Sequence, residues 1–142
     1  MELIADTSAI VSELLRARGQ ALLRHPMLTW FATEEIASEV HHEVPRRVSA
    51  LGARRGLAHA TAAALGASTL HLFDTTIRII PRTTYTPLLA SAATRIGDPD
   101  DRATVALALA MGAGIWTLDH DFFGIGLPVW STDVLLRHIA TP

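Results

Sequence analysis

The chain opens with ELIADTS, residues Glu2 to Ser8, and this stretch decides the fold class. Its apolar residues predict a buried strand from Glu2 to Ala5. Asp6 and the two hydroxyl residues after it are favoured at helix starts, so a helix is expected to follow through Leu15. A strand that passes directly into a helix is typical of α/β proteins, and here a carboxylate stands at the junction.

Two further groups of acidic residues border apolar segments in the same way. One group follows the apolar run Leu88 to Ile96, and the other follows Gly114 to Leu118; their members are Asp98, Asp100 and Asp101, and Asp119 and Asp121. Carboxylates gathered at the ends of buried elements repel one another and lose hydration, which lowers stability unless a cation or a proton compensates. We therefore predict that these acids meet around a divalent metal ion.

Strand and helix patterns alternate along the chain, which predicts an α/β fold with a parallel sheet flanked by helices. Further strands are expected at Met27 to Ala32, Ile77 to Pro81, Gly114 to Leu118 and Pro128 to Trp130. Further helices are expected at Glu34 to about Val44, where Pro45 ends or bends the helix, in one or two pieces from Arg46 to about Ser68, at Pro87 to Arg95, at Pro99 to Met111, and after Ser131 or Thr132. The chain contains no repeat and no linker, so residues 1–142 are expected to form a single domain.

Composition excludes several kinds of chemistry. The 142 residues include no cysteine, so disulfides, thiolate zinc sites and thiol nucleophiles are excluded. All 12 basic residues are arginine, and the formal net charge is -2. Without lysine, the chain cannot be a P-loop enzyme or a phosphotransfer domain that depends on a lysine. The N-terminus lacks the pattern of a signal peptide and no apolar run is long enough to span a membrane, so a soluble cytoplasmic protein is expected.

Parallel-sheet geometry connects the acids. Ligands of an open parallel sheet bind outside the carboxyl ends of the strands, where the winding reverses. Asp6 ends the first strand and Asp119 ends the fourth, so a reversal between these strands would make the two acids neighbours, about 5 Å apart. Carboxylate oxygens are hard ligands that suit Mg²⁺ or Mn²⁺.

Each acid also has a purely structural interpretation. Asp6 could simply cap a helix. Asp98 fits the same role before Pro99, and Asp101 suits the positive end of that helix. Asp119 and Asp121 could belong to an ordinary polar turn. The metal interpretation is favoured for the set, because three independent turns would otherwise have to place acids at sheet ends by chance.

The helix after Thr33 supplies another candidate acid. Glu35, Glu39 and Glu43 recur every four residues and so share one face, although like charges at this spacing destabilise a helix by roughly 0.2 to 0.5 kcal/mol per pair. Glu39 borders the buried side marked by Val40 and could point into a cleft, although the helical period alone does not separate it clearly from the other two. Glu35 and Glu43 are expected in solvent.

These residues resemble the motifs of the PIN domain nucleases, especially the toxin ribonucleases of VapBC toxin–antitoxin pairs. The matching segments span nearly the whole chain and are Ala5 to Ile10, Glu39-Val40, Asp101 with the apolar helix Val105 to Ala110, and Ile115 to Phe122. The resemblance implies a three-layer PIN-like fold with strand order 3-2-1-4-5. It also implies metal-binding and catalytic acids at Asp6, Glu39, Asp101 and Asp119, with Asp121 and Asp98 as additional metal ligands. Thr117 and Ser8 match the hydroxyl residues beside the fourth and first acids.

The resemblance further implies an Mg²⁺- or Mn²⁺-dependent endoribonuclease, an RNA substrate, a VapB-like antitoxin as partner, and a homodimer. Arg16, Arg46, Arg47 and Arg102 are candidates for contacts with RNA phosphates, although exposed arginine is usually only solvated. The departure from the family lies in residues 46–76, which cannot be matched to its pattern residue by residue. Two alternatives stay open: a PIN-like nuclease that acts in RNA processing or on DNA outside a toxin pair, and a catalytically silent binding module.

Overall fold

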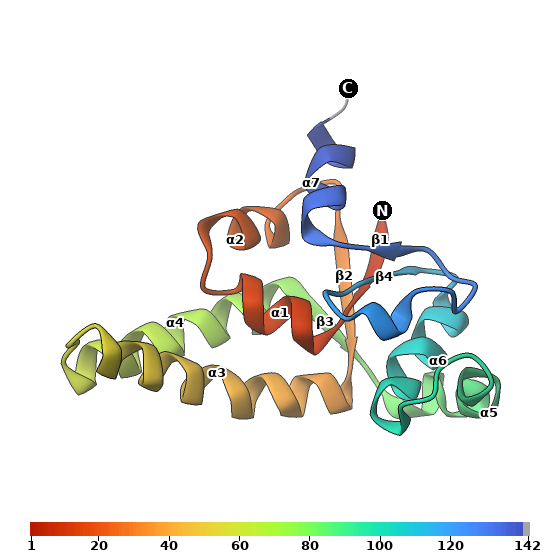
Figure 1. Ribbon diagram of the computed structural model, residues 1–142, viewed down its shortest axis with the longest axis horizontal. Helices are drawn as coiled ribbons and strands as arrows, with labels where there is room; N and C mark the ends of the chain where they lie inside the picture. The colour runs from red at the N-terminus through yellow and green to blue at the C-terminus, as the bar shows by residue number, and fades with distance from the viewer. Residues whose placement is uncertain (141–142) are drawn as a thin grey trace.

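The computed structural model describes residues 1–140, and a five-stranded parallel sheet lies at its centre (Figure 1). The strands are β1 (Glu2–Ala5), β2 (Thr29–Thr33), β3 (Ile77–Ile80), β4 (Gly114–Trp116) and β5 (Val129–Trp130). They are ordered β3-β2-β1-β4-β5 and every neighbouring pair is parallel, which confirms the predicted order 3-2-1-4-5. The winding therefore reverses between β1 and β4.

Within residues 1–140, seven α-helices and four short 3₁₀ segments surround the sheet. The α-helices are α1 (Thr7–Glu13), α2 (Ala17–Leu23), α3 (Glu34–Arg54), α4 (His59–Thr76), α5 (Leu89–Ala93), α6 (Arg102–Met111) and α7 (Thr132–Ala140). The 3₁₀ segments are η1 (Arg82–Thr84), η2 (Thr86–Leu88), η3 (Pro99–Asp101) and η4 (His120–Phe122). In Figure 1, α5 and α6 lie on one side of the sheet, and α1 to α4 lie on the other.

The strands alternate their side chains between two cores, as their period of two requires. Leu3 and Ala5 of β1 pack into the core shared with α1 to α4, and Ile4 packs into the core beneath α5 and α6. Trp30 of β2 and Trp116 of β4 meet in the first core with their ring centroids 4.8 Å apart. The fold therefore has three layers, as the resemblance to PIN domains implied.

The long helix α3 does not end at Pro45, because it runs from Glu34 to Arg54 with Pro45 inside it. Its residues Val40, Val44 and Val48 recur every four positions and are buried in the core that α3 shares with α4. Burying each such side chain stabilises the fold by roughly 1.5 to 3 kcal/mol, and together they outweigh the cost of about 3 kcal/mol for a proline inside a helix. The helix α4 is likewise continuous from His59 to Thr76, with Gly66 inside it.

Smaller differences concern element length. The helix α2 was not predicted at all, and the first helix ends at Glu13 rather than Leu15. The predicted helix from Pro87 to Arg95 is a 3₁₀ segment followed by the five-residue α5. Among the helices of residues 1–140, none has the length and apolar character needed to cross a bilayer. Residues 141–142 of the predicted single domain lie outside the described part of the chain.

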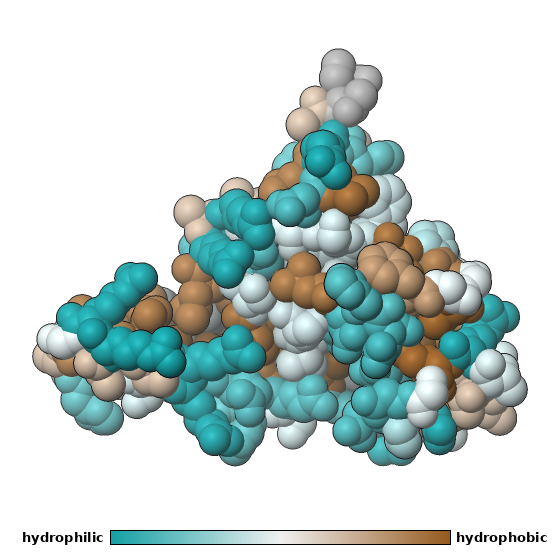
Figure 2. All heavy atoms as spheres, viewed as in Figure 1, coloured by the Kyte–Doolittle hydropathy of each residue, from teal (hydrophilic) through white to brown (hydrophobic). Residues whose placement is uncertain are grey.

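Hydrophilic side chains gather over α3 on the face seen in Figure 2, with hydrophobic patches between them and the sheet. The exposed residues of α3 include Arg46, Arg47 and Arg54, whereas its buried positions face the core. The polar and apolar faces of α3 thus follow the helical period, as expected for a helix that packs on one side only.

Candidate functional site

The carboxyl ends of β1 and β4 lie side by side, because Ala5 pairs with Trp116 in the sheet register. The backbone N–H of Asp6 donates to the carbonyl oxygen of Trp116 at 2.9 Å, which extends the ladder by one residue. Asp6 and Thr117 are therefore the first residues beyond two adjacent strands. Asp119 follows two positions later, so the first and fourth strands deliver acids to one edge of the sheet, as predicted.

The buried side chain of Asp6 is oriented by hydroxyl groups. Its Oδ2 accepts hydrogen bonds from Ser8 Oγ at 2.5 Å and from Thr117 Oγ1 at 2.8 Å, and a longer one from the N–H of Ser8 at 3.3 Å. Within the described residues, Oδ1 of Asp6 accepts no hydrogen bond. The side chain caps α1, as its structural interpretation required, and still leaves one oxygen unengaged.

The same hydroxyls connect Asp6 to the loop after β4. Ser8 Oγ accepts from the N–H of Leu118 at 3.1 Å, and Thr117 Oγ1 accepts from the N–H of Asp119 at 3.0 Å. Each hydroxyl thus donates to the carboxylate of Asp6 and accepts from a backbone amide of the loop after β4. Their matches to the hydroxyl positions of the nuclease motif correspond to a physical task, which is to hold two acidic segments in register.

Glu39 reaches this edge from α3. Its Oε2 accepts a hydrogen bond from Thr7 Oγ1 at 2.6 Å, so it lies beside the residue that follows Asp6. Glu43, one turn further on, lies 4.0 Å from Arg46 instead. Glu39 therefore lies at this edge of the sheet, whereas Glu43 lies near Arg46.

Asp101 approaches from the start of α6 and, unlike Asp6, makes no capping hydrogen bond with its side chain. Burial and the negative charges of Asp6, Asp98, Asp119 and Asp121 together raise the pKa of Asp101 to about 7. The pKa of this carboxyl therefore depends directly on the charges of the other acids. The electrostatic cost that the sequence predicted for gathered acids is concentrated at this residue.

The acids surround a pocket of about 280 Å³ at the carboxyl edge of the sheet. Its acidic lining residues are Asp6, Glu35, Glu39, Asp100, Asp101 and Asp119. All four residues predicted as catalytic are in this set, and they come from four separate segments of the chain. Thr7, Ser8, Thr33 and Thr104 add hydroxyl groups to the lining.

The two additional predicted ligands, Asp98 and Asp121, do not line the pocket. Asp98 caps the 3₁₀ segment η3, where its Oδ1 accepts from the N–H of Asp100 at 2.9 Å. Asp121 is exposed, and its backbone N–H donates to Asp119 Oδ1 at 2.9 Å. Their observed contacts are those of caps and turns, while their charges still act on Asp101.

Glu35 was expected in solvent, and that expectation is wrong. It is partly buried, accepts a hydrogen bond from the hydroxyl of buried Tyr85 at 2.5 Å, and lies 3.1 Å from Arg82. Burial acts to raise the pKa of Glu35, but the Tyr85 hydrogen bond and Arg82 outweigh it, and the net pKa is lowered. Burial and the bond to Glu35 in turn raise the pKa of Tyr85 to about 12. No local pattern pointed to this network, because its members are about 50 positions apart.

The donor set of the pocket is made of carboxylate and hydroxyl oxygens, which is the chemistry that Mg²⁺ and Mn²⁺ prefer. Among the described residues, no three acidic or histidine side chains converge closely enough to ligate one ion together. Mg²⁺ usually keeps several waters and is held through one or two carboxylates, so a spaced ring of acids fits a hydrated ion. The residues present therefore suit a hydrated divalent cation, with Asp6 Oδ1 and Asp101 as carboxylates that make no hydrogen bond within residues 1–140.

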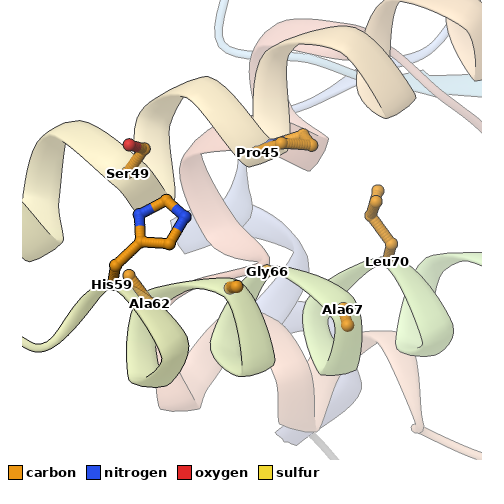
Figure 3. Close-up of a pocket in the computed structure, with 8 residues that line it drawn as sticks. Pro45, Ser49, His59, Ala62, Gly66, Ala67 and Leu70 are labelled. Carbon is orange, nitrogen blue, oxygen red and sulfur yellow. The ribbon is translucent and has the colours of Figure 1, made fainter.

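A second hollow of about 440 Å³ lies between α3 and α4 (Figure 3). Pro45 and Ser49 of α3 line one side, and His59, Ala62, Gly66, Ala67 and Leu70 of α4 line the other. No carboxylate or arginine lines this hollow. The small side chains of α4 account for the space here.

The sequence profile of the PIN domain family matches residues 4–140 of the chain. Among solved structures, PAE2754 from Pyrobaculum aerophilum is similar with a TM-score of 0.69 and 17% identity, covering 100% of this chain and 91% of that one. VapBC2 from Rickettsia felis, bound to a DNA fragment from its promoter, has a TM-score of 0.67 and 15% identity, with coverage of 92% and 98%. FitAcB from Neisseria gonorrhoeae has a TM-score of 0.59 and 19% identity, with coverage of 92% and 97%. Because these identities are low, the similarity to these structures shows a shared fold and nothing more. No curated protein sequence gives a match.

Proposed function

Because the chain belongs to the PIN domain family, we propose that it is an Mg²⁺- or Mn²⁺-dependent endoribonuclease that hydrolyses RNA phosphodiester bonds. One observation carries the proposal: four separate segments of the chain place Asp6, Glu39, Asp101 and Asp119 around a single pocket. That pocket lies at the carboxyl ends of β1 and β4, where the winding of the sheet reverses and where open α/β folds bind ligands.

The protein residues would act mainly by holding charge in place. Asp6 and Asp119 would ligate the cation from the two adjacent strand ends, and Asp101 would complete the site directly or through water. A bound Mg²⁺ or Mn²⁺ would stabilise the developing charge on the phosphate and lower the pKa of an attacking water. Ser8 and Thr117 would keep Asp6 from turning away, since both donate to its Oδ2. Glu39, held by Thr7, would orient the water or hold a second ion.

We further propose that the nuclease is the toxin of a type II toxin–antitoxin pair with a VapB-like antitoxin. The solved structures similar to this chain include VapBC2 from Rickettsia felis and VapBC-1 from nontypeable Haemophilus influenzae, and this supports an antitoxin partner. A ribonuclease that is active inside its own cell needs such an inhibitor. A homodimer belongs to the same proposal.

The catalytic proposal is tested by RNA cleavage with purified variants. Asp6→Asn and Asp119→Asn should each lose roughly 100-fold or more in rate in the presence of Mg²⁺, because several kcal/mol of transition-state stabilisation depend on the cation. Asp74→Asn is the matched control, since Asp74 is an exposed acid of α4 whose one ion pair among the described residues is with His41. The same oligonucleotide made as DNA distinguishes RNA from DNA cleavage. Wild-type cleavage that persists in EDTA would count against the proposal.

Toxicity is a separate prediction. Expression of the wild-type chain should arrest growth of the host, and Asp101→Asn should not, because removal of a cation ligand removes cleavage of cellular RNA. Growth curves after induction, at equal protein levels on a blot, measure the difference. Equal arrest by both forms would exclude RNA cleavage as the cause, whereas efficient cleavage in vitro without any arrest would favour a nuclease outside a toxin pair.

A further inference from the structure

A second cleft, distinct from the hollow between α3 and α4 and about 510 Å³ in volume, adjoins the acidic pocket. The two hollows share Glu35, Glu39 and Asp100 in their linings, so one opens beside the other. Beyond those acids, the second cleft is bounded by two arginines, Arg82 and Arg102, and by an apolar wall. Its volume lies in the usual range for pockets that take small organic groups, roughly 300 to 1,000 Å³.

The two arginines differ in how far other residues neutralise them. Arg82, from η1, lies 3.1 Å from Glu35, but 62% of its side chain is exposed. Arg102, the first residue of α6, is partly buried and forms no ion pair with any described residue. Its Nη2 donates only a long bond, 3.5 Å, to the carbonyl oxygen of Gly97. Its Nε is buried without a hydrogen-bond partner among residues 1–140.

An unneutralised, partly buried guanidinium is costly unless an anion compensates it, because burial disfavours a charge that has no partner. The usual explanation for arginine, a solvated surface charge, fits Arg102 poorly for that reason. The guanidinium presents donors in a planar fork that matches a phosphate. Arg102 also directly follows Asp101 in the sequence, so the arginine is the neighbour of a residue that lines the acidic pocket.

The remaining wall of the cleft is aliphatic. It consists of Leu89, Ala90 and Ala93 from α5 with Pro99 and Ala103. A phosphate group needs no such surface, whereas the flat face of a nucleobase can bury itself against aliphatic side chains. The cleft thus combines a phosphate-binding edge with a surface that suits a base.

We propose that this cleft is a nucleotide subsite, in which Arg102, assisted by Arg82, binds the RNA phosphate next to the scissile one while the attached base lies against α5. The subsite rests on the proposed ribonuclease function. It also answers an electrostatic difficulty, because six carboxylates line the pocket of a chain with net charge -2 and repel RNA. A local arginine contact would hold the strand where the chain as a whole does not attract it.

The test combines a protein variant with a substrate variant. Binding of a short fluorescent RNA that the wild-type protein cleaves is measured by anisotropy, with Ca²⁺ in place of Mg²⁺ because Ca²⁺ also takes oxygen ligands. A panel of the same RNA carries one methylphosphonate, a neutral replacement for a phosphate, at each position near the cleaved bond. At one position adjacent to that bond, the methylphosphonate should weaken wild-type binding about tenfold.

The decisive result is non-additivity. Arg102→Gln should weaken binding of the unmodified RNA by about the same tenfold factor, and the methylphosphonate at that one position should then cost nothing more. Arg55→Gln is the matched control: it removes the same charge from an exposed arginine at the far end of α3, and should leave the methylphosphonate effect intact. Arg102→Lys keeps the charge but lacks the planar fork, so binding should be partly restored.

Each contrary outcome has a distinct meaning. If the methylphosphonates weaken RNA binding by Arg102→Gln as much as binding by wild type at every position, Arg102 contacts no phosphate. The proposed subsite is then wrong, although the proposed ribonuclease function is unaffected. If the wild-type protein neither binds nor cleaves RNA with a divalent cation present, the proposed function fails and the subsite fails with it. Equal melting temperatures of wild type, Arg102→Gln and Arg102→Lys show that folding is not the cause.

Discussion

Asp6 and Asp101 lie in the same pocket, but the protein holds them in opposite ways. Asp6 accepts three hydrogen bonds on one oxygen, and these bonds fix the orientation of its carboxylate. Asp101 makes no capping hydrogen bond, and burial together with the neighbouring acids raises its pKa to about 7. The charge of the pocket is therefore most costly at Asp101, and this is the residue at which a cation would bring the largest relief.

Asp101→Asn should stabilise the protein in metal-free buffer in a pH-dependent way. Between the ordinary pKa of 3.8 and the folded value of about 7, the unfolded chain releases the Asp101 proton and the folded chain retains it, so wild-type stability falls as pH rises through this window. Asparagine does not titrate. The difference in melting temperature between Asp101→Asn and wild type should therefore be near zero below pH 3.8 and largest above about pH 7.

Thermal denaturation followed by circular dichroism across that pH range measures the difference. Asp74→Asn, an exposed acid outside the pocket, serves as the control and should show a much smaller change with pH. Added Mg²⁺ should raise the melting temperature of wild type more than that of Asp101→Asn, because ligand binding to the folded state stabilises it. A stability difference that stays constant with pH would contradict the assigned cost.

At the scale of elements, close packing decides where helices run. α3 continues through Pro45 because its valines are buried along α4, and Gly52 of α3 allows the two helices to approach. A Cβ atom at Gly52 would lie 2.9 Å from the Cβ of Ala62. α2 packs even more tightly on α1, since a Cβ at Gly19 would lie 2.2 Å from the carbonyl oxygen of Glu13. The turn between α1 and α2 thus depends on a residue without a side chain.

Gly19→Ala should lower the free energy of unfolding by roughly 1 to 3 kcal/mol or more, because backbone atoms of Glu13 must move to admit the new methyl group. Gly66→Ala is the matched control, as it makes the same change inside α4 where the nearest atom, of Val48, is 3.8 Å away. There alanine should stabilise the helix by roughly 0.5 to 1 kcal/mol. Urea unfolding measures the change in the free energy of unfolding for each variant, which should be a loss for Gly19→Ala and a gain for Gly66→Ala. Equal effects would show that Gly19 is not under steric constraint.

At the scale of the whole molecule, an ion-pair network joins helices from opposite ends of the chain. Glu13 of α1 is fully buried and accepts from Arg18 of α2 at 2.7 and 3.1 Å. Arg18 also donates to Asp133 of α7 at 2.9 Å. The C-terminal helix is thereby connected to the N-terminal part of the chain through one guanidinium.

Arg18→Ala should lower the melting temperature markedly, because it leaves the buried carboxylate of Glu13 without its main partner. Arg24→Ala removes an exposed arginine at the end of the same helix and should have little effect. The double variant Glu13→Gln with Arg18→Ala should recover part of the loss, since it removes the buried charge. If Arg18→Ala alone melts with wild type, the network does not hold the helices together.

The prediction from sequence was most complete where the physical cause is local. Strand burial follows from runs of apolar residues, and acids at strand ends meet because parallel strands share one carboxyl edge. The resemblance to PIN domains added the order of the strands and the choice of Glu39. The expectation for Glu35 failed because its partners, Tyr85 and Arg82, lie about 50 positions away and no local pattern connects them.

The amino-acid order by itself determined the alternation of strands and helices and the positions of the acids at the strand ends, since both depend on neighbouring residues. Only the tertiary structure decided that α3 continues past Pro45 and that Arg82 compensates the charge of Glu35. It also decided that Arg102 lies in the cleft beside the acidic pocket, with a buried nitrogen that has no hydrogen-bond partner among residues 1–140. The reason is that burial and charge compensation are set by which distant segments are brought together, and their free energies exceed local helix and turn preferences.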